Sequence, residues 1–171
     1  MTLEQLLAIM PLARQRAGLF FPALNSAMAE FGINTPARQA SFLAQLGHES
    51  GQLRYVRELA SGAAYEGRAD LGNTVAGDGV RYKGRGLLQI TGRANYAACG
   101  RALALALVER PELLELVPHA CRSAAWFWQS RGLNELADAG DQLRITRRIN
   151  GGSTGLAERL ALFARARAVL A

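Results

Sequence analysis

Two glutamates are the residues best placed to do chemistry in this chain of 171 residues. Glu49 falls at the expected C-terminal end of a helix, on the same side as Phe42 and Leu46. The negative end of the helix dipole and an apolar flank both favour the protonated carboxyl, which is the form a general acid needs. Glu58 follows beyond a break at Gly51, where a loop could carry it across a cleft. Two such acids are the minimum for glycoside hydrolysis, although most glutamate pairs at this spacing are solvated surface.

The histidines do not support triad or metal chemistry. The chain has only two, His48 and His119, which argues against a serine or cysteine triad. His48-Glu49 opens like the zinc-protease motif HExxH, but Gln52 stands where the second histidine ligand would be. We therefore expect no metal site, and we expect His48 to be a packing or hydrogen-bonding neighbour rather than a catalyst.

Nucleotide and redox chemistry fail on spacing. Gly84 and Gly86 resemble the start of a dinucleotide loop, but Gln89 replaces the third glycine and there is no P-loop. Cys99 and Cys121 are too far apart for a redox or metal motif, so we expect two buried thiols in a reducing compartment. No cofactor is expected.

Helix signals dominate the chain outside its middle. Thr2 and Gln5 have capping-box spacing, and Thr35-Pro36 predicts the start of the helix that carries Glu49. Gly32 is placed to end the helix before it. Further helices are expected over 95–108, from Pro111, from Pro118 to Gly132, from Asp141 to Asn150, and from Gly155 to the C-terminus.

The middle of the chain has a different texture. Between Gly51 and Gly92 glycine becomes frequent and periodicity fades, which predicts irregular loop or a short β-hairpin. Neither a repeat nor a linker interrupts the sequence. We therefore expect one mainly α domain over residues 1–171, with half of its residues hydrophobic and able to form a core.

Several segments resemble glycoside hydrolase family 19, which contains plant-type chitinases and phage endolysins. Phe42–Gly51 resembles the family's catalytic helix, and Arg57–Leu59 resembles the segment with the second carboxylate. Tyr82–Tyr96 is close to the family's GRGxxQxTGxxNY segment, and Trp126–Trp128 and Ile149–Arg159 follow in the family's order. The resemblance implies a lysozyme-like helical domain of two lobes, with the glycine-rich segment flanking the cleft and no separate wall-binding domain.

The resemblance also implies a role for each matching residue. Glu49 would be the general acid and Glu58 the base that activates a water on the opposite sugar face, which gives inversion and carboxylates about 6.5–9.5 Å apart. Thr91 would hold that water through its hydroxyl. The residues expected to bind substrate are Gln89, Asn95, Tyr96, Asn150 and Arg159, the last also orienting the carboxylates.

Each of these binding assignments has a structural alternative. Gln89 and Asn95 could cap backbone groups in a glycine-rich turn, and Asn150 before two glycines is also a good helix terminator. Tyr96 could pack in the core or the cleft wall. At least one aromatic residue of Trp126–Trp128 is expected in the core.

The short gap between Glu49 and Glu58 is similar to the phage-endolysin branch of the family, whereas plant chitinases carry a longer insert. The chain also lacks the many cysteines of secreted plant enzymes. We therefore expect peptidoglycan glycan strands as substrate, with chitin as the alternative. A net charge of +6 agrees with an anionic wall. The resemblance suggests muramidase-type cleavage, and cleavage after N-acetylglucosamine stays open.

Met1–Gln5 lacks the basic start and apolar stretch of a signal peptide, so we expect none, and no run approaches the ~18 apolar residues of a membrane span. We expect a monomer made in the cytoplasm, without membrane insertion, that acts at the cell wall in the periplasm through a holin or a secretion system. Arg144, Arg147 and Arg148 superficially suggest a nucleic-acid-binding helix. Because the other basic residues are scattered, no nucleic-acid partner is expected.

Overall fold

The computed structural model describes residues 1–171, and most of its helices begin at the signals in the sequence. In α1 (Leu3–Ile9) the Thr2 hydroxyl accepts from the Gln5 N–H at 3.1 Å, and the Gln5 side chain accepts from the Thr2 N–H at 2.8 Å. The capping box is therefore confirmed. Thr35 caps α3 (Pro36–Glu49) by accepting from the Arg38 N–H.

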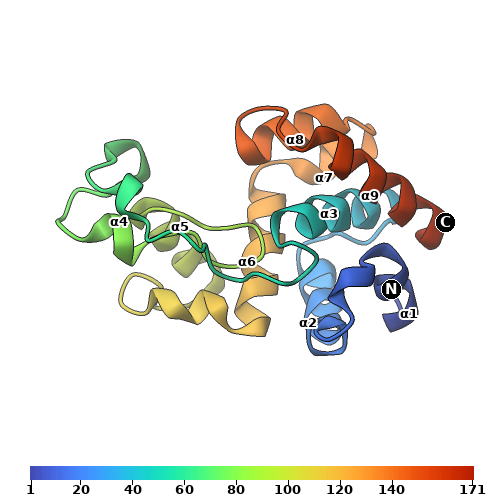
Figure 1. Cartoon of the computed structure of the whole chain (residues 1–171), viewed down its shortest axis with the longest axis horizontal. Coiled ribbons are helices and arrows are strands. Elements are labelled where there is room, and N and C mark those ends of the chain that lie inside the picture. The colour runs from blue at the N-terminus through green and yellow to red at the C-terminus, as the bar shows by residue number, and fades with distance from the viewer.

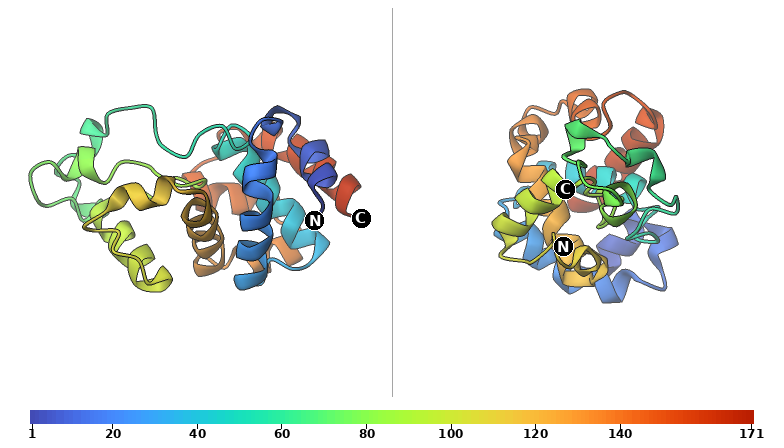
Figure 2. Two further views of the ribbon diagram at one scale, coloured as in Figure 1. Left: turned by 90° about the horizontal axis from the view of Figure 1, so that it is seen from below. Right: turned by 90° about the vertical axis from the view of Figure 1, so that its left-hand side faces the viewer.

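The helices form two lobes of unequal size (Figures 1 and 2). The smaller lobe holds α4 and α5 with the irregular chain around them, and α6 lies between it and the larger lobe (Figure 1). The mainly α, two-lobed expectation is confirmed. The remaining elements are α2 (Ala17–Glu30), α4 (Asp78–Arg81), α5 (Arg93–Leu103), α6 (Val117–Ser130), α7 (Leu133–Asp138), α8 (Gln142–Asn150), α9 (Leu156–Leu170) and the 3₁₀ helices Pro11–Ala13, Ala63–Tyr65, Ala69–Leu71 and Pro111–Glu115.

The core of the larger lobe fixes the helix that carries Glu49. Phe42 on α3 meets Trp128 on α6 edge to face, with ring centroids 5.4 Å apart. Trp128 is fully buried, and its indole N–H donates to the Asn134 side chain at 2.9 Å. Trp128 is the core aromatic that the sequence led us to expect, and it ties α3 to the helix between the lobes.

The glycine-rich middle is irregular, and the short hairpin is reduced to isolated antiparallel bridges that pair Arg85 with Arg57 and with Ile90. Polar contacts order this chain in place of a sheet. The Glu66 carboxylate accepts from the N–H groups of Gly77 and Gly79 at 2.7 and 2.8 Å.

A second contact fixes the start of α5. The Arg93 guanidinium binds the buried Asp78 carboxylate at 2.5 Å and lowers the pKa of Asp78. This contact stabilises the folded protein at any pH above the ordinary pKa of an aspartate. The stabilisation is lost as the pH falls through the lowered pKa of Asp78.

One expectation about a helix is wrong, and one short helix was not foreseen. The helix predicted over 95–108 ends at Leu103, because Ala104 adopts a left-handed conformation (φ 55°) and the chain folds back over Gly100. An added Cβ at Gly100 would lie 2.6 Å from the Leu105 carbonyl, so only glycine admits this approach. The short helix α7 was not predicted from the sequence.

Both cysteines are free and buried, as expected. Burial raises the pKa of each thiol to about 12. In the structure, no helix has both the length and the apolar character that crossing a membrane requires.

Close packing at Gly72 can be separated from backbone strain with a matched pair of variants. Gly72 and Gly67 have nearly equal φ (71° and 67°). A Cβ added at Gly72 would lie 2.7 Å from the Ala94 Cβ, whereas a Cβ added at Gly67 would have no atom within 4 Å. Both alanine variants carry the left-handed penalty of roughly 1–2 kcal/mol. We expect Gly72→Ala to lose a further 1–3 kcal/mol or so through overpacking. Urea unfolding measures the difference, and equal stabilities would contradict it.

Candidate active site

Glu49 is the last residue of α3, where the helix brings its half-buried carboxylate against the first turns of α9. Arg159 on α9 donates from Nη2 to Glu49 Oε1 at 2.5 Å. The Arg159 side chain is only 3% exposed, so the guanidinium is fixed in one place. The observed neighbour of the Glu49 carboxylate is thus a permanent cation, whereas the sequence led us to expect an apolar flank.

A buried polar network holds Arg159 in turn. Its Nη1 donates to Gln45 Oε1 at 2.5 Å, and Gln45 Nε2 donates to the Thr146 hydroxyl at 3.2 Å. Gln45 and Thr146 are fully buried. The network joins α3, α8 and α9, so the position of the Glu49 carboxylate depends on three helices of the larger lobe.

Glu58 belongs to the smaller lobe, where the loop after α3 runs beside the chain that precedes α5. The Glu58 N–H donates to the Gly84 carbonyl at 2.9 Å. Its carboxylate accepts from the Gly84 N–H at 3.0 Å and from the Tyr65 hydroxyl at 3.0 Å. Burial first, and then the Glu58 carboxylate, raise the pKa of Tyr65, so this hydroxyl keeps its proton and donates.

Three expected site residues meet at Gly84. A Cβ added there would lie 2.6 Å from Gln89 Oε1, 3.2 Å from Glu58 Oε2 and 3.3 Å from Thr91 Oγ1. The carboxylate, the amide and the hydroxyl therefore surround the Gly84 Cα, and any side chain at this position would displace them. Gln89 has a left-handed backbone (φ 54°), which is costly for a residue other than glycine and is typical of functional sites.

Gln89, Thr91 and Asn95 line a pocket of about 230 Å³ together with side chains of α6 and α8. The Gln89 amide donates to the Gly86 carbonyl, and the Asn95 amide donates to the Thr91 carbonyl. The amide N–H groups of Gln89 and Asn95 thus bind backbone carbonyls, as the alternative interpretation of these residues predicted. Their side-chain oxygens stay available to accept hydrogen bonds. The other residues of the pocket are Leu71, Ile90, Trp126, Phe127, Arg131 and Ile149.

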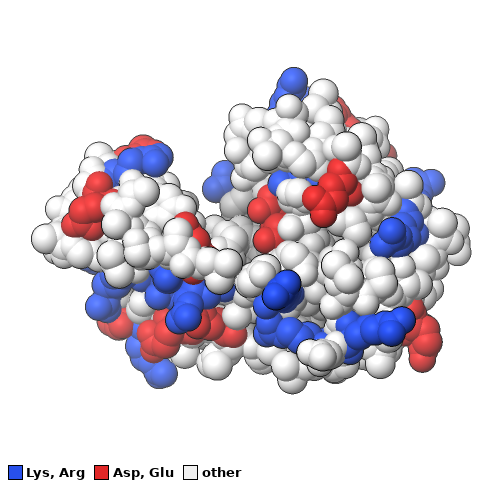
Figure 3. Space-filling model, viewed as in Figure 1, with Lys and Arg blue, Asp and Glu red and all other residues white.

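The two carboxylates stand on different lobes. Figure 3 shows acidic atoms on both sides of the hollow between the lobes. A guanidinium holds the Glu49 carboxylate in the larger lobe, and two neutral donors hold the Glu58 carboxylate in the smaller lobe. The two carboxylates therefore have different electrostatic surroundings, one with a permanent cation and one without.

Tyr96 and Asn150 lie outside both clusters. Tyr96 is fully buried, with its hydroxyl donating to the Lys83 carbonyl at 2.6 Å, so its assignment as a substrate-binding residue is corrected to core packing. Asn150 ends α8, with its side chain bonded to the Thr154 carbonyl and the Gly152 N–H. Its helix-terminating alternative is therefore what the structure shows, and substrate binding by Asn150 stays a prediction.

The sequence did not point to Tyr65, which donates to the Glu58 carboxylate, or to Gln45, which accepts from Arg159 beside Glu49. Nothing in the spacing of Tyr65 marks it, since six residues, none of them in an α-helix, separate it from Glu58. Gln45 had a weak signal, as a polar residue on the buried side of an amphipathic helix. His48 contacts the Glu158 carboxylate at 2.9 Å and packs against Gly155, in line with a neighbouring role.

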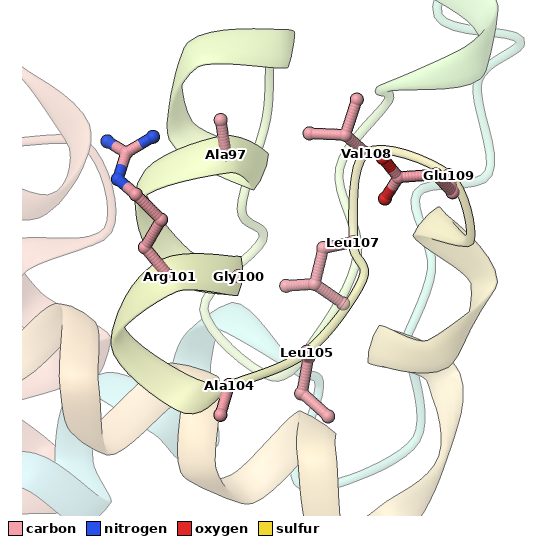
Figure 4. A pocket seen from close by; sticks show the side chains of 8 residues that line it. All are labelled: Ala97, Gly100, Arg101, Ala104, Leu105, Leu107, Val108 and Glu109. Carbon is pink, nitrogen blue, oxygen red and sulfur yellow. The ribbon is translucent and has the colours of Figure 1, made fainter.

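A second pocket, of about 330 Å³, offers no comparable chemistry. It lies between α5 and the chain that folds back over it (Figure 4), and Glu109 is the one carboxylate that lines it. In Figure 4 the Arg101 side chain points away from Leu107 and Val108. No group of three or more His, Cys, Asp or Glu side chains in the structure could hold a metal ion.

A mainly helical fold with a glutamate in each of two lobes is compatible with glycoside hydrolysis, which uses a pair of carboxylates. The family model described as chitinase class I, glycoside hydrolase family 19, matches residues 24–138. This chain belongs to glycoside hydrolase family 19.

Relatives come from bacteria and plants. A glycosyl hydrolase family 19 domain-containing protein of Haemophilus influenzae is 32% identical over 174 residues, which cover 84% of this chain and 85% of that protein. An endochitinase of Arabidopsis thaliana is 36% identical over 136 residues, which cover 78% of this chain. The match covers 46% of that endochitinase, so the chain spans about half the length of this plant relative.

Solved structures show the same fold. A bacterial family 19 chitinase superposes with a TM-score of 0.81 at 23% identity, covering 99% of this chain and 94% of that one. Chitinase C of Streptomyces griseus HUT6037 gives 0.79 at 23% identity, with 99% and 76% covered.

Removing either carboxylate should stop turnover without unfolding the protein. Glu49→Gln and Glu58→Gln keep the side-chain shape and lose the group that transfers a proton, so we expect kcat/KM to fall at least 100-fold or so. Asp70→Asn is the matched control, because Asp70 pairs with Arg68 on the surface. Glycan hydrolysis and circular dichroism together check this. A mild effect of Glu58→Gln would assign the base elsewhere.

The Tyr65 hydroxyl should hold the Glu58 carboxylate in its working position. Tyr65→Phe removes one of the two donors to that carboxylate and keeps the ring. We expect kcat to fall about 10-fold, as the loss of one hydrogen bond to a charged group implies. Tyr82→Phe serves as control, because its hydroxyl donates to the Val108 carbonyl, and an equal fall in kcat in both variants would contradict this role of Tyr65.

Proposed function

We propose that this protein hydrolyses β-1,4 glycosidic bonds of bacterial peptidoglycan by an inverting acid/base mechanism, as an endolysin that degrades the cell wall. The observation that carries the proposal is the convergence of Glu58, Thr91 and Gln89 on Gly84, in the lobe opposite the Glu49–Arg159 pair. Membership of glycoside hydrolase family 19 supports the reaction class.

In this mechanism Glu49 transfers its proton to the glycosidic oxygen as the bond from that oxygen to C1 breaks. A water between Glu58 and Thr91 gives one proton to Glu58, and its oxygen bonds to C1 from the opposite face of the sugar. Thr91 holds the water through its hydroxyl, and Arg159 fixes the Glu49 side chain. One water is consumed, and solvent returns both carboxyl groups to their starting protonation states.

Gln89 and Asn95 are assigned to sugar hydroxyls and N-acetyl groups. Both side chains line the pocket beside Thr91, and each has a carbonyl oxygen that the backbone contacts leave free to accept. Donor groups on an N-acetyl sugar match these acceptors.

The short connection between Glu49 and Glu58 and the net charge of +6 support peptidoglycan as the substrate, since bacterial walls are anionic. Chitin is the second candidate, because relatives from plants are named endochitinases and the similar bacterial structures are chitinases. In the peptidoglycan role, the protein would be a monomer made in the cytoplasm that reaches the wall in the periplasm through a holin or a secretion system.

The two substrates can be ranked directly. We expect faster hydrolysis of purified peptidoglycan than of chitohexaose at equal concentrations of glycosidic bonds, and the reverse order would favour the chitinase. Mass spectrometry of digested and borohydride-reduced wall identifies the sugar at the new reducing end. N-acetylmuramic acid there, as its reduced alditol, is the expected muramidase-type result, and reduced N-acetylglucosamine would assign the other bond.

A further inference from the structure

A cationic pocket of about 500 Å³ lies beside the catalytic acid and plays no part in the mechanism above. Its size is within the range of small-ligand sites. Gly47 and Gly51 on either side of Glu49 line it, as does Glu158, which precedes Arg159. Because consecutive Cα atoms are 3.8 Å apart, the Gly51 Cα lies within about 7.6 Å of the Glu49 Cα. The remaining residues of the pocket are Leu12, Ala13, Gln15, Arg16, Gln52, Arg54 and Tyr55.

The backbone that forms the pocket is held in a costly conformation. Gly51, Gln52 and Leu53 are all left-handed, with φ of 57°, 57° and 69°. Two of them are not glycine, and such strain persists only where the surroundings enforce it. The Ser50 hydroxyl accepts from the Leu53 N–H at 2.8 Å, and the Gln52 side chain accepts from the Leu12 N–H at 3.0 Å.

Two arginines line the pocket, Arg54 directly after this turn and Arg16 at the start of α2. Arg16 donates to the Arg54 carbonyl at 2.6 Å and lies over the Phe20 ring, so its position is fixed. Arg54 lies over the Tyr55 ring and forms no ion pair. Against these two cations the pocket has one carboxylate, Glu158.

The charge balance selects the chemistry of a ligand. Guanidinium groups bind carboxylates through paired N–H donors, whereas an uncharged sugar would cover the cations without neutralising them. Figure 3 shows basic atoms over the N-terminal elements, on the same face as the acidic atoms beside the hollow. The pocket therefore suits an anionic group on a side branch of a glycan whose main chain lies in the hollow.

We infer that this pocket, with Arg16 and Arg54, binds a carboxylate of the peptide stem of peptidoglycan and so favours peptide-bearing strands. The inference rests on the proposed function and names the part of the substrate that distinguishes it from chitin. The free carboxylates of an intact strand are those of its stem peptides. Chitin has none.

The test compares two forms of one substrate. Peptide-bearing glycan strands are used as isolated and after their carboxylates have been converted to amides by carbodiimide coupling with ammonia. For each enzyme the readout is the ratio of kcat/KM on native strands to kcat/KM on amidated strands. We expect a ratio of about 10 or more for the wild type, as charge-assisted hydrogen bonds imply. Arg54→Gln should bring the ratio close to one.

Arg101→Gln is the matched control, because Arg101 lies on α5 in the smaller lobe, at the pocket of Figure 4. It should keep the wild-type ratio. A wild-type ratio near one, an unchanged ratio in Arg54→Gln, or an equal loss in Arg101→Gln would each overturn the inference while leaving peptidoglycan hydrolysis in place. Hydrolysis of chitohexaose with no cleavage of either strand would overturn the proposed function as well.

Discussion

The contact between Glu49 and Arg159 is the interaction on which the rest of the site depends. It joins the end of α3 to the start of α9, and it places a buried cation against a partly exposed carboxylate. A guanidinium buried to this extent requires partners for its donors, and Gln45, Glu49 and the Thr154 carbonyl supply them. The packing of α3, α8 and α9 therefore also determines the position of the Glu49 carboxylate.

In the smaller lobe the second carboxylate, that of Glu58, is held in position without a cation. Backbone and hydroxyl donors hold Glu58, and glycine at position 84 leaves the space that its neighbours occupy. Both donors are neutral, so no charged neighbour is needed to hold this carboxylate. The two lobes thus give two chemically equal side chains different surroundings, a guanidinium in one and neutral donors in the other.

The sequence predicted the helices well and the irregular parts poorly. Caps at Thr2 and Thr35 and the break at Gly51 depend on local contacts, so the positions of α1 and α3 could be read from neighbouring residues. The early end of α5 depends on a distant carbonyl that closes on Gly100, which no local pattern reveals. Family resemblance identified Glu58, Gln89 and Thr91, but Tyr65 and the burial of Tyr96 depend on how the loops fold in space.

The two free thiols bear on where this fold can persist. Cys99 and Cys121 lie in the core with a pKa of about 12, so at neutral pH they stay protonated and poorly reactive toward oxidants. No disulfide crosslinks the chain, and its stability comes from apolar packing, hydrogen bonds and ion pairs. Glutathione therefore has no disulfide to reduce in this fold, and burial protects the two thiols from oxidants. The same folded state can persist in reducing and in oxidising surroundings.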